Sequence, residues 1–202
     1  MAVVQLHELV LASASPRRRD ILGQLGLSFR VIESGVEEAP PGGRPPEAYA
    51  RELAAQKAEA VAARIGSEGS HAFVLGADTI VVVDAAILGK PSDDADAERM
   101  LLALRGRTHE VITAVALRRA GSDFASALAV RSRVAFRNFD DETAQRYAAS
   151  GEGRDKAGSY AVQGLGAGLV RAIDGSYSNV VGLPACETLE LLIAAAVIGA
   201  WP

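Results

Sequence analysis

An acid in the middle of an apolar run is the residue of this sequence that most needs a chemical explanation. Asp78 lies inside the run 74–84, with apolar and β-branched residues on both sides. Such a run is typical of a strand buried on both faces of an α/β sheet. A buried carboxylate costs on the order of several kcal/mol unless it is paired, hydrogen-bonded or bound to a cation. Asp78 therefore either caps a turn at a strand end or acts on a ligand, and the apolar residues 80–83 that continue the strand favour the second interpretation.

Two adjacent arginines follow a serine-rich turn near the start of the chain. Ser15 suits the N-cap and Pro16 the first position of a helix, so Arg17 and Arg18 fall in its first turn. The helix dipole is already positive there, and cations beside a positive helix end, with Ser13 and backbone N–H groups, form a site for a polyanion. The alternative is a solvated basic turn.

Further charged residues occur on predicted helices and loops. Lys57 lies on the apolar stripe of a helix predicted at about 47–65, where a lysine either snorkels to water, the commoner case, or reaches an anion in a pocket. Lys90 is kept extended by Pro91 and follows an apolar stretch. The carboxylates and cations suit a hard divalent cation and a polyphosphate. They are Asp78, Glu38, Arg17, Arg18, Lys57, Lys90 and Lys156.

The elements that must position these residues follow from periodicity and from capping residues. Strands are expected at 9–12, 29–33, 74–84, 109–117, 124–137, 169–173 and 180–181. Helices are expected from Pro16 to Gly26, over 47–65, from Ser92 as N-cap to Gly106, from Asp140 as N-cap to Gly151, and over 187–196. The glycine-rich segment 151–168, which holds Asp155, Lys156 and Gln163, is predicted to be a functional loop.

Composition narrows the class of protein. The chain has 202 residues and a formal net charge of −4, which argues against non-specific nucleic-acid binding, and its one basic cluster, at 17–19, is local. Cys186 is the only cysteine, so there is no internal disulfide, and a reducing cytoplasm is weakly indicated. The N-terminus does not resemble a cleaved signal, and the apolar tail 191–201 is too short to span a bilayer. We expect no nucleic-acid or membrane partner.

Three common catalytic or nucleotide motifs are not supported. Gly89-Lys90 is followed by proline and lacks the glycine spacing of a P-loop. The glycines at 164–168 precede a strand and have the wrong spacing for a dinucleotide fingerprint. No Gly-x-Ser-x-Gly elbow of a serine hydrolase occurs.

Five collinear motifs resemble those of the Maf family over about residues 9–192. They are Ser13-Ala14-Ser15-Pro16-Arg17-Arg18, Gly76-Ala77-Asp78-Thr79, Gly89-Lys90-Pro91, Asp155-Lys156-Ala157-Gly158 and Gly182-Leu183-Pro184. The resemblance implies a nucleoside triphosphate pyrophosphatase that uses a divalent metal, Mg or Mn, to release a monophosphate and pyrophosphate. It also implies an α/β fold, with an elongated mixed sheet flanked by helices around a central cleft, similar to the inosine triphosphate pyrophosphatases. The resemblance also implies a single domain over residues 1–202, which can be divided into two lobes. It further implies a cytoplasmic protein that is often a homodimer.

The family's functional positions are matched residue by residue. The resemblance implies that Asp78 is the proton acceptor or a metal ligand, and that Glu38 holds the metal with it. The other matched positions are implied to bind substrate: Ser13, Arg17, Arg18, Lys57, Thr79, Lys90, Asp155, Lys156 and Gln163. Gln56 and Ser159 depart from common family residues but lie outside this set.

Arg17, Thr79 and Gln163 match the subfamily that prefers dTTP and UTP to 7-methyl-GTP. In a regular strand Asp78 and Thr79 face opposite sides, so both reach one ligand only if the strand bulges or ends near them.

Two other functions remain open. The family name is tied to nucleotide house-cleaning and to arrest of septum formation and cell division, so one alternative is a regulator that binds a nucleotide without turnover. The other is a phosphohydrolase that releases orthophosphate.

Overall fold

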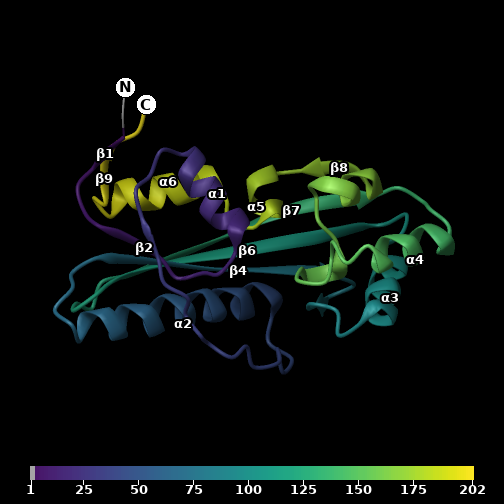
Figure 1. Ribbon diagram of the computed structural model, residues 1–202, viewed down its shortest axis with the longest axis horizontal. Helices are drawn as coiled ribbons and strands as arrows, with labels where there is room; N and C mark the ends of the chain where they lie inside the picture. The colour runs from purple at the N-terminus through teal and green to yellow at the C-terminus, as the bar shows by residue number, and fades with distance from the viewer. Residues whose placement is uncertain (1–2) are drawn as a thin grey trace. The chain divides into compact units, whose positions relative to one another are not determined.

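The computed structural model describes residues 3–202 and has a mixed α/β architecture (Figure 1). The strands are β1 (Val4–Gln5), β2 (Leu9–Leu11), β3 (Arg30–Val31), β4 (Phe73–Val83), β5 (Ala86–Leu88), β6 (Thr108–Arg119), β7 (Ala125–Phe136), β8 (Val170–Asp174) and β9 (Ile198–Ala200). The α-helices are α1 (Pro16–Gln24), α2 (Pro46–Gly66), α3 (Asp94–Leu104), α4 (Asp141–Ala149), α5 (Tyr177–Val181) and α6 (Ala185–Ala194). Two 3-10 helices, η1 (Ala157–Ser159) and η2 (Gly164–Leu169), interrupt the glycine-rich segment.

Within residues 3–202, a seven-stranded sheet has the order β3-β2-β4-β6-β7-β8, with β5 paired to β4. β2 is parallel to both β3 and β4, whereas β5 is antiparallel to β4 and β8 is antiparallel to β7. The predicted mixed sheet flanked by helices is therefore confirmed. β1 and β9 form a separate antiparallel pair that the sequence analysis did not predict.

The chain divides into two compact units. Unit 1 contains the described residues through Asp78, with Thr113–Val130 and Gly182–Pro202. Unit 2 contains Thr79–Ile112 and Arg131–Val181. The boundaries fall inside β4, β6 and β7, so each of these strands contributes residues to both units.

Unit 1 is a layered structure built on the buried strand β2, whose three residues are all inaccessible to solvent. Figure 1 shows α2 on one face of the strands of this unit and α1 and α6 on the other. α2 buries the apolar stripe predicted from its spacing, and Leu53, Ala54, Ala58 and Val61 are in the core. The burial of both faces explains why β4 is apolar apart from Asp78 and Thr79.

Unit 2 has its own core, built from β4, β7, α3, α4 and the end of the glycine-rich segment. Val81, Leu101, Val134 and Tyr160 are buried members of this cluster. His109 is also buried here and lies edge-on to the ring of Tyr160. The segment 151–168 is therefore packed against a core, although it contains only short 3-10 turns.

Two local predictions were wrong. Residues 180–181 end the short helix α5 and are not in a strand; Asn179, buried within that helix, donates to the Val111 carbonyl 3.1 Å away. Asp93, not Ser92, caps α3, because its carboxylate accepts from the backbone N–H of Asp96 at 2.8 Å. The predicted Asp140 cap of α4 is confirmed by a 2.8 Å bond from the Thr143 N–H.

Among the described residues, no helix combines the length and the apolar character needed to cross a membrane.

Candidate active site

A buried lysine joins two carboxylates in unit 1. Lys57 Nζ donates to Asp78 Oδ1 at 2.6 Å and to Glu38 Oε1 at 2.7 Å. Only 9% of Lys57 and 5% of Asp78 is exposed, whereas Glu38 lies on an exposed loop. Lys57 therefore does not snorkel to solvent; it reaches into the protein toward an anionic group, which was the less common of the two expected cases.

The close approach of α2 to β4 brings Lys57 to Asp78. A Cβ atom on Gly76 would lie 2.4 Å from the Ala54 carbonyl oxygen and 2.7 Å from the Ala58 nitrogen. Only glycine fits between this strand and this helix. Gly76 and Asp78 share one face of β4, since side chains alternate along a strand, and Lys57 lies in the helical turn above that face.

The pKa of Asp78 is raised above its ordinary value. Burial raises it, and the attraction and hydrogen bond of Lys57 and the charge of Arg18 oppose this effect without cancelling it. A carboxylate whose pKa lies above its usual range accepts a proton more readily at neutral pH than an exposed carboxylate does. The direction of this shift is the one expected for a carboxylate that serves as a general base.

Arg18 is held at the beginning of α1 by two acceptors. Its Nη1 donates to Ser13 Oγ at 3.1 Å and its Nε to the Gly182 carbonyl at 2.9 Å. Burial lowers the pKa of Arg18, and the nearby carboxylates Asp78 and Glu38 raise it. These electrostatic contacts place Arg18, Asp78 and Glu38 in one charged cluster. Ser15 fills the N-cap position, as predicted, but its side chain makes no capping hydrogen bond.

The sequence analysis gave Tyr49 and Gly182 no role, yet both support this cluster. Tyr49 Oη donates to the Ala39 carbonyl at 2.9 Å and so fastens the loop that holds Glu38. Tyr49 occurs on the apolar stripe of α2, and its periodicity gives no sign of this bond. The sequence signal that could have identified Gly182 is its place in one of the five motifs.

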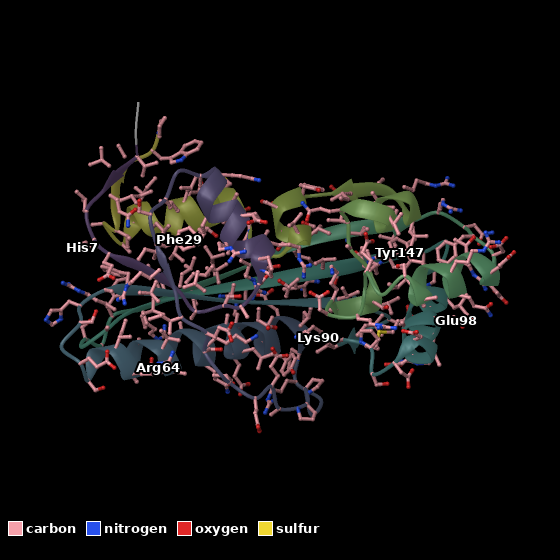
Figure 2. The ribbon with its side chains drawn as sticks, viewed as in Figure 1. His7, Phe29, Arg64, Lys90, Glu98 and Tyr147 are labelled. Atoms are coloured by element: carbon pink, nitrogen blue, oxygen red, sulfur yellow. The ribbon has the colours of Figure 1, made fainter. Side chains whose placement is uncertain are left out.

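Arg17 lies in the first turn of α1, in unit 1, and the remaining predicted residues belong to unit 2. Lys156 Nζ donates to Asp155 Oδ1 at 2.5 Å and to the Glu152 carbonyl at 2.6 Å. Lys90, labelled in Figure 2, and Gln163 are both exposed.

Thr79 faces away from the Lys57–Asp78 pair. β4 is a continuous strand from Phe73 to Val83, so Asp78 and Thr79 face opposite sides. Thr79 shares its face with Val81, which packs so closely on η1 that a Cβ on Gly158 would lie 3.0 Å from Val81 Cγ1. The strand does not end near these positions, since β4 continues to Val83.

The donor set can be tested against a divalent metal. Among residues 3–202, no three acidic, histidine or cysteine side chains are grouped as a complete metal site. Glu38 and Asp78 provide two carboxylates within reach of one ammonium group. Mg²⁺ is commonly held by one or two carboxylates, with substrate phosphates and water as the other ligands. The two carboxylates therefore fit a metal that binds together with a phosphorylated substrate.

Comparison with known proteins identifies the family of this chain and several similar proteins. The family described as "Maf-like protein" matches residues 8–195 of this chain. A protein of Pelotomaculum thermopropionicum is 46% identical over 187 residues, which cover 93% of this chain and 96% of the relative. A Shewanella oneidensis protein is 49% identical over 195 residues, 94% of this chain and 99% of its own. A Myxococcus xanthus protein is 50% identical over 184 residues, 91% of this chain and 90% of its own. All three are named dTTP/UTP pyrophosphatase.

Proposed function

Because this chain belongs to the Maf family, we propose that it hydrolyses dTTP and UTP to the nucleoside monophosphate and pyrophosphate. The observation that carries the proposal is the buried Asp78, with a raised pKa and a 2.6 Å bond to Lys57. The shared name of relatives that are 46–50% identical over at least 90% of this chain supports the substrate.

The proposed reaction breaks the bond between the α phosphorus and the oxygen that bridges to the β phosphorus. A water oxygen attacks the α phosphorus, Asp78 accepts the water's proton, and pyrophosphate leaves with the bridging oxygen. Such transfers depend mainly on positioning and on charge stabilisation. A side-chain base positioned on the attacking water accelerates a reaction by about 100- to 10,000-fold.

Four cations neutralise the triphosphate in this proposal: Arg17, Arg18, Lys57 and Lys90. Arg18 is already oriented by Ser13 and Gly182, so its guanidinium needs little reordering when substrate binds. Lys57 keeps Asp78 ionised over part of the pH range in which burial alone would protonate it. Ser13, Asp155 and Lys156 complete the substrate contacts.

Mg²⁺ or Mn²⁺ belongs to the same proposal. Glu38 and Asp78 would hold the metal, and a bound divalent cation supplies charge stabilisation at the phosphate oxygens. If Asp78 is a ligand, a second group or the substrate itself takes the proton, so its two roles are alternatives to be separated by experiment.

Base selection is assigned to Arg17, Thr79 and Gln163. Thr79 faces the side of β4 opposite to Asp78, so it acts on the base only if the nucleotide extends beyond the Lys57–Asp78 face. Gln163 is exposed, and its amide can both donate and accept hydrogen bonds. We also place the enzyme in the cytoplasm, where the lone Cys186 stays reduced. A homodimer and a link to cell division stay predictions.

The first experiment measures pyrophosphate and orthophosphate from dTTP, UTP, CTP and 7-methyl-GTP, with Mg²⁺ or Mn²⁺. Pyrophosphate from dTTP and UTP, lost in Asp78→Asn, supports the reaction and the subfamily. Orthophosphate as the first product would instead indicate a different kind of phosphohydrolase. Binding without any product would favour the regulator that does not turn over nucleotide.

A further inference from the structure

The carboxylate of Glu152 binds the glycine-rich segment from inside unit 2. Its Oε1 accepts from the Leu165 N–H at 2.9 Å, and its Oε2 accepts from the Gly166 N–H at 2.8 Å. The Tyr147 hydroxyl donates to the same Oε2 at 2.7 Å. None of the roles proposed above uses Glu152 or Tyr147.

Tyr147, labelled in Figure 2, connects this carboxylate to a second part of the same segment. Its hydroxyl oxygen accepts from the Ala161 N–H at 3.0 Å, and the ring is almost fully buried. The Tyr147–Glu152 pair therefore fixes the backbone at Ala161, two residues before Gln163. It also fixes Leu165 and Gly166, two and three residues after Gln163.

Two glycines make this close approach feasible. A Cβ atom on Gly164 would lie 2.2 Å from Glu152 Oε1, and Gly164 has φ +68°. A Cβ on Gly166 would lie 2.1 Å from the Ala161 carbonyl and 2.6 Å from the Tyr147 hydroxyl. Only glycine fits at either position. In the local sequence Gln163-Gly164-Leu165-Gly166, the exposed glutamine side chain is therefore attached to a backbone that hydrogen bonds to Glu152 and Tyr147 hold in place.

The charge of Glu152 strengthens these bonds. Burial raises its pKa, but the hydrogen bonds from Tyr147, Leu165 and Gly166 and the charge of Lys156 outweigh burial, so that the pKa lies below its ordinary value. Glu152 is therefore ionised at neutral pH. Hydrogen bonds to an ionised acceptor are about twice as strong as neutral ones.

The side chain of Glu152 can be changed without removing the hydrogen bond that Lys156 makes to the Glu152 backbone. Lys156 Nζ donates to the backbone carbonyl of Glu152, at 2.6 Å. That oxygen is present whatever the side chain is. A substitution at 152 thus acts on the segment around Gln163 and keeps this hydrogen bond, while the charge of Glu152 near Lys156 is lost.

We propose that Tyr147 and Glu152 are a positioning pair that fixes the backbone of Gln163 and thereby sets the preference for thymine and uracil over cytosine. The inference rests on the proposed function of Gln163. Thymine and uracil present an N3–H donor beside the O4 acceptor, whereas cytosine presents an N3 acceptor beside an amino donor. A glutamine amide can pair with either base, but only in opposite orientations, so its selectivity depends on how firmly it is held.

The test measures the ratio of kcat/KM for UTP to kcat/KM for CTP in matched variants. The variants are Glu152→Gln, Tyr147→Phe, Gln163→Ala and the double variant Glu152→Gln/Gln163→Ala. Glu142→Gln, an exposed acid of α4 paired with Arg146, is the control. This ratio does not depend on the fraction of enzyme that is folded, so a loss of stability alone leaves it unchanged.

The expected result is a fall of at least about fivefold in the ratio for Glu152→Gln and for Tyr147→Phe, since one lost hydrogen bond corresponds to about fivefold and the Tyr147 hydroxyl makes two. Glu142→Gln should match the wild type. In the Gln163→Ala background, Glu152→Gln should cause no further fall, because the two residues act through one contact.

The outcomes separate this inference from the proposed function. If the wild type releases no pyrophosphate, the proposed function fails. If Gln163→Ala leaves the ratio unchanged, the role of Gln163 fails and this inference fails with it. If Gln163→Ala lowers the ratio but Glu152→Gln leaves it unchanged, or lowers it further in the double variant, the positioning pair alone is overturned.

Discussion

Lys57 on α2 and Asp78 on β4 form a buried ion pair, with Nζ and Oδ1 2.6 Å apart. Burial raises the pKa of Asp78, and Lys57 opposes this rise without cancelling it, so the pKa lies above its ordinary value. Removing one partner of such a pair is usually more damaging than replacing both, since it leaves a buried charge uncompensated. This relationship leads to the first three predictions.

Replacing Asp78 by asparagine should lower kcat for pyrophosphate release by about 100- to 10,000-fold, the usual contribution of a positioned base. The protein should still fold, because asparagine has nearly the same shape and Lys57 retains Glu38. Steady-state kinetics and thermal unfolding would measure both. Asp84→Asn is the control, since Asp84 is exposed in the turn after β4 and pairs with Arg107. A kcat within threefold of the wild type would remove Asp78 from the reaction.

Lys57→Gln should move the acid limb of the kcat/KM profile to higher pH. Lys57 lowers the pKa of Asp78, so its removal raises that pKa further, and Asp78 is protonated over a wider range of pH. Activity should then fall more at pH 6 than at pH 8. Arg64→Gln changes an exposed cation of the same helix and should leave the profile unchanged. An acid limb at the wild-type pH in Lys57→Gln would contradict the electrostatic coupling.

Gly76→Ala should reduce both stability and turnover. The added Cβ would collide with the Ala54 carbonyl and the Ala58 nitrogen, forcing α2 away from β4 and Lys57 away from Asp78. Overpacking of this kind costs about 1–3 kcal/mol in the free energy of unfolding. Urea unfolding and pyrophosphate release would measure the two effects. Gly23→Ala, in α1, is the control because nothing lies within 4 Å of its Cβ position; equal behaviour of the two variants would refute the packing argument.

Tyr49→Phe should weaken the apparent affinity for Mg²⁺ by about fivefold, with kcat at saturating metal close to the wild-type value. The substitution removes the 2.9 Å bond to Ala39 that fastens the loop of Glu38, and one hydrogen bond contributes about 1 kcal/mol. Metal titration of the rate tests this. Tyr177→Phe removes a hydroxyl from an exposed tyrosine of unit 2 and serves as the matched variant. An unchanged metal titration in Tyr49→Phe would argue against Glu38 as a metal ligand.

His109 should make the fold less stable in mild acid. Burial lowers the pKa of His109 from 6.5 to about 4. Below pH 6.5 the unfolded chain therefore binds a proton that the folded chain does not, and the stability present above pH 6.5 is lost as the pH falls toward 4. The loss amounts to about 2 kcal/mol between pH 7.5 and 5.

Urea unfolding at these two pH values, with His109→Gln beside the wild type, measures this contribution. The variant should show a smaller loss between pH 7.5 and 5, even if it is less stable at both because the 2.7 Å contact with Tyr160 is changed. His71→Gln alters an exposed histidine and should follow the wild type. An equal loss in His109→Gln would assign the acid sensitivity to other groups.

Local sequence was sufficient for most of the secondary structure. The stripe of α2, the apolar run of β4 and the Asp140 cap of α4 each depend on neighbours within a few residues, and each is observed as predicted. Residues 180–181 read as a strand because they are β-branched. They end a helix because Asn179 buries its amide against Val111, 68 residues earlier in the chain.

The sequence supplied the residues of the candidate site through the motifs that resemble the Maf family, but not their pairing. Periodicity put Lys57 on an apolar stripe and left two outcomes open. The tertiary structure decided between them, because Asp78 lies 21 residues away and meets Lys57 only where Gly76 lets α2 approach β4. The bond from Arg18 to Gly182 spans 164 residues.

Glu152 shows where sequence reasoning ends. An acid in a glycine-rich loop is usually a solvated side chain. Nothing near Glu152 in the sequence indicates that its oxygens accept hydrogen bonds from the N–H groups of Leu165 and Gly166. Helix and strand preferences are set by steric and capping effects between neighbouring residues, so the sequence alone determined most of the elements, but not α5 or the β1–β9 pair. The ion pair of Lys57, the orientation of Arg18 and the anchoring of Gln163 depend on burial and on contacts between distant segments, which only the folded chain brings together.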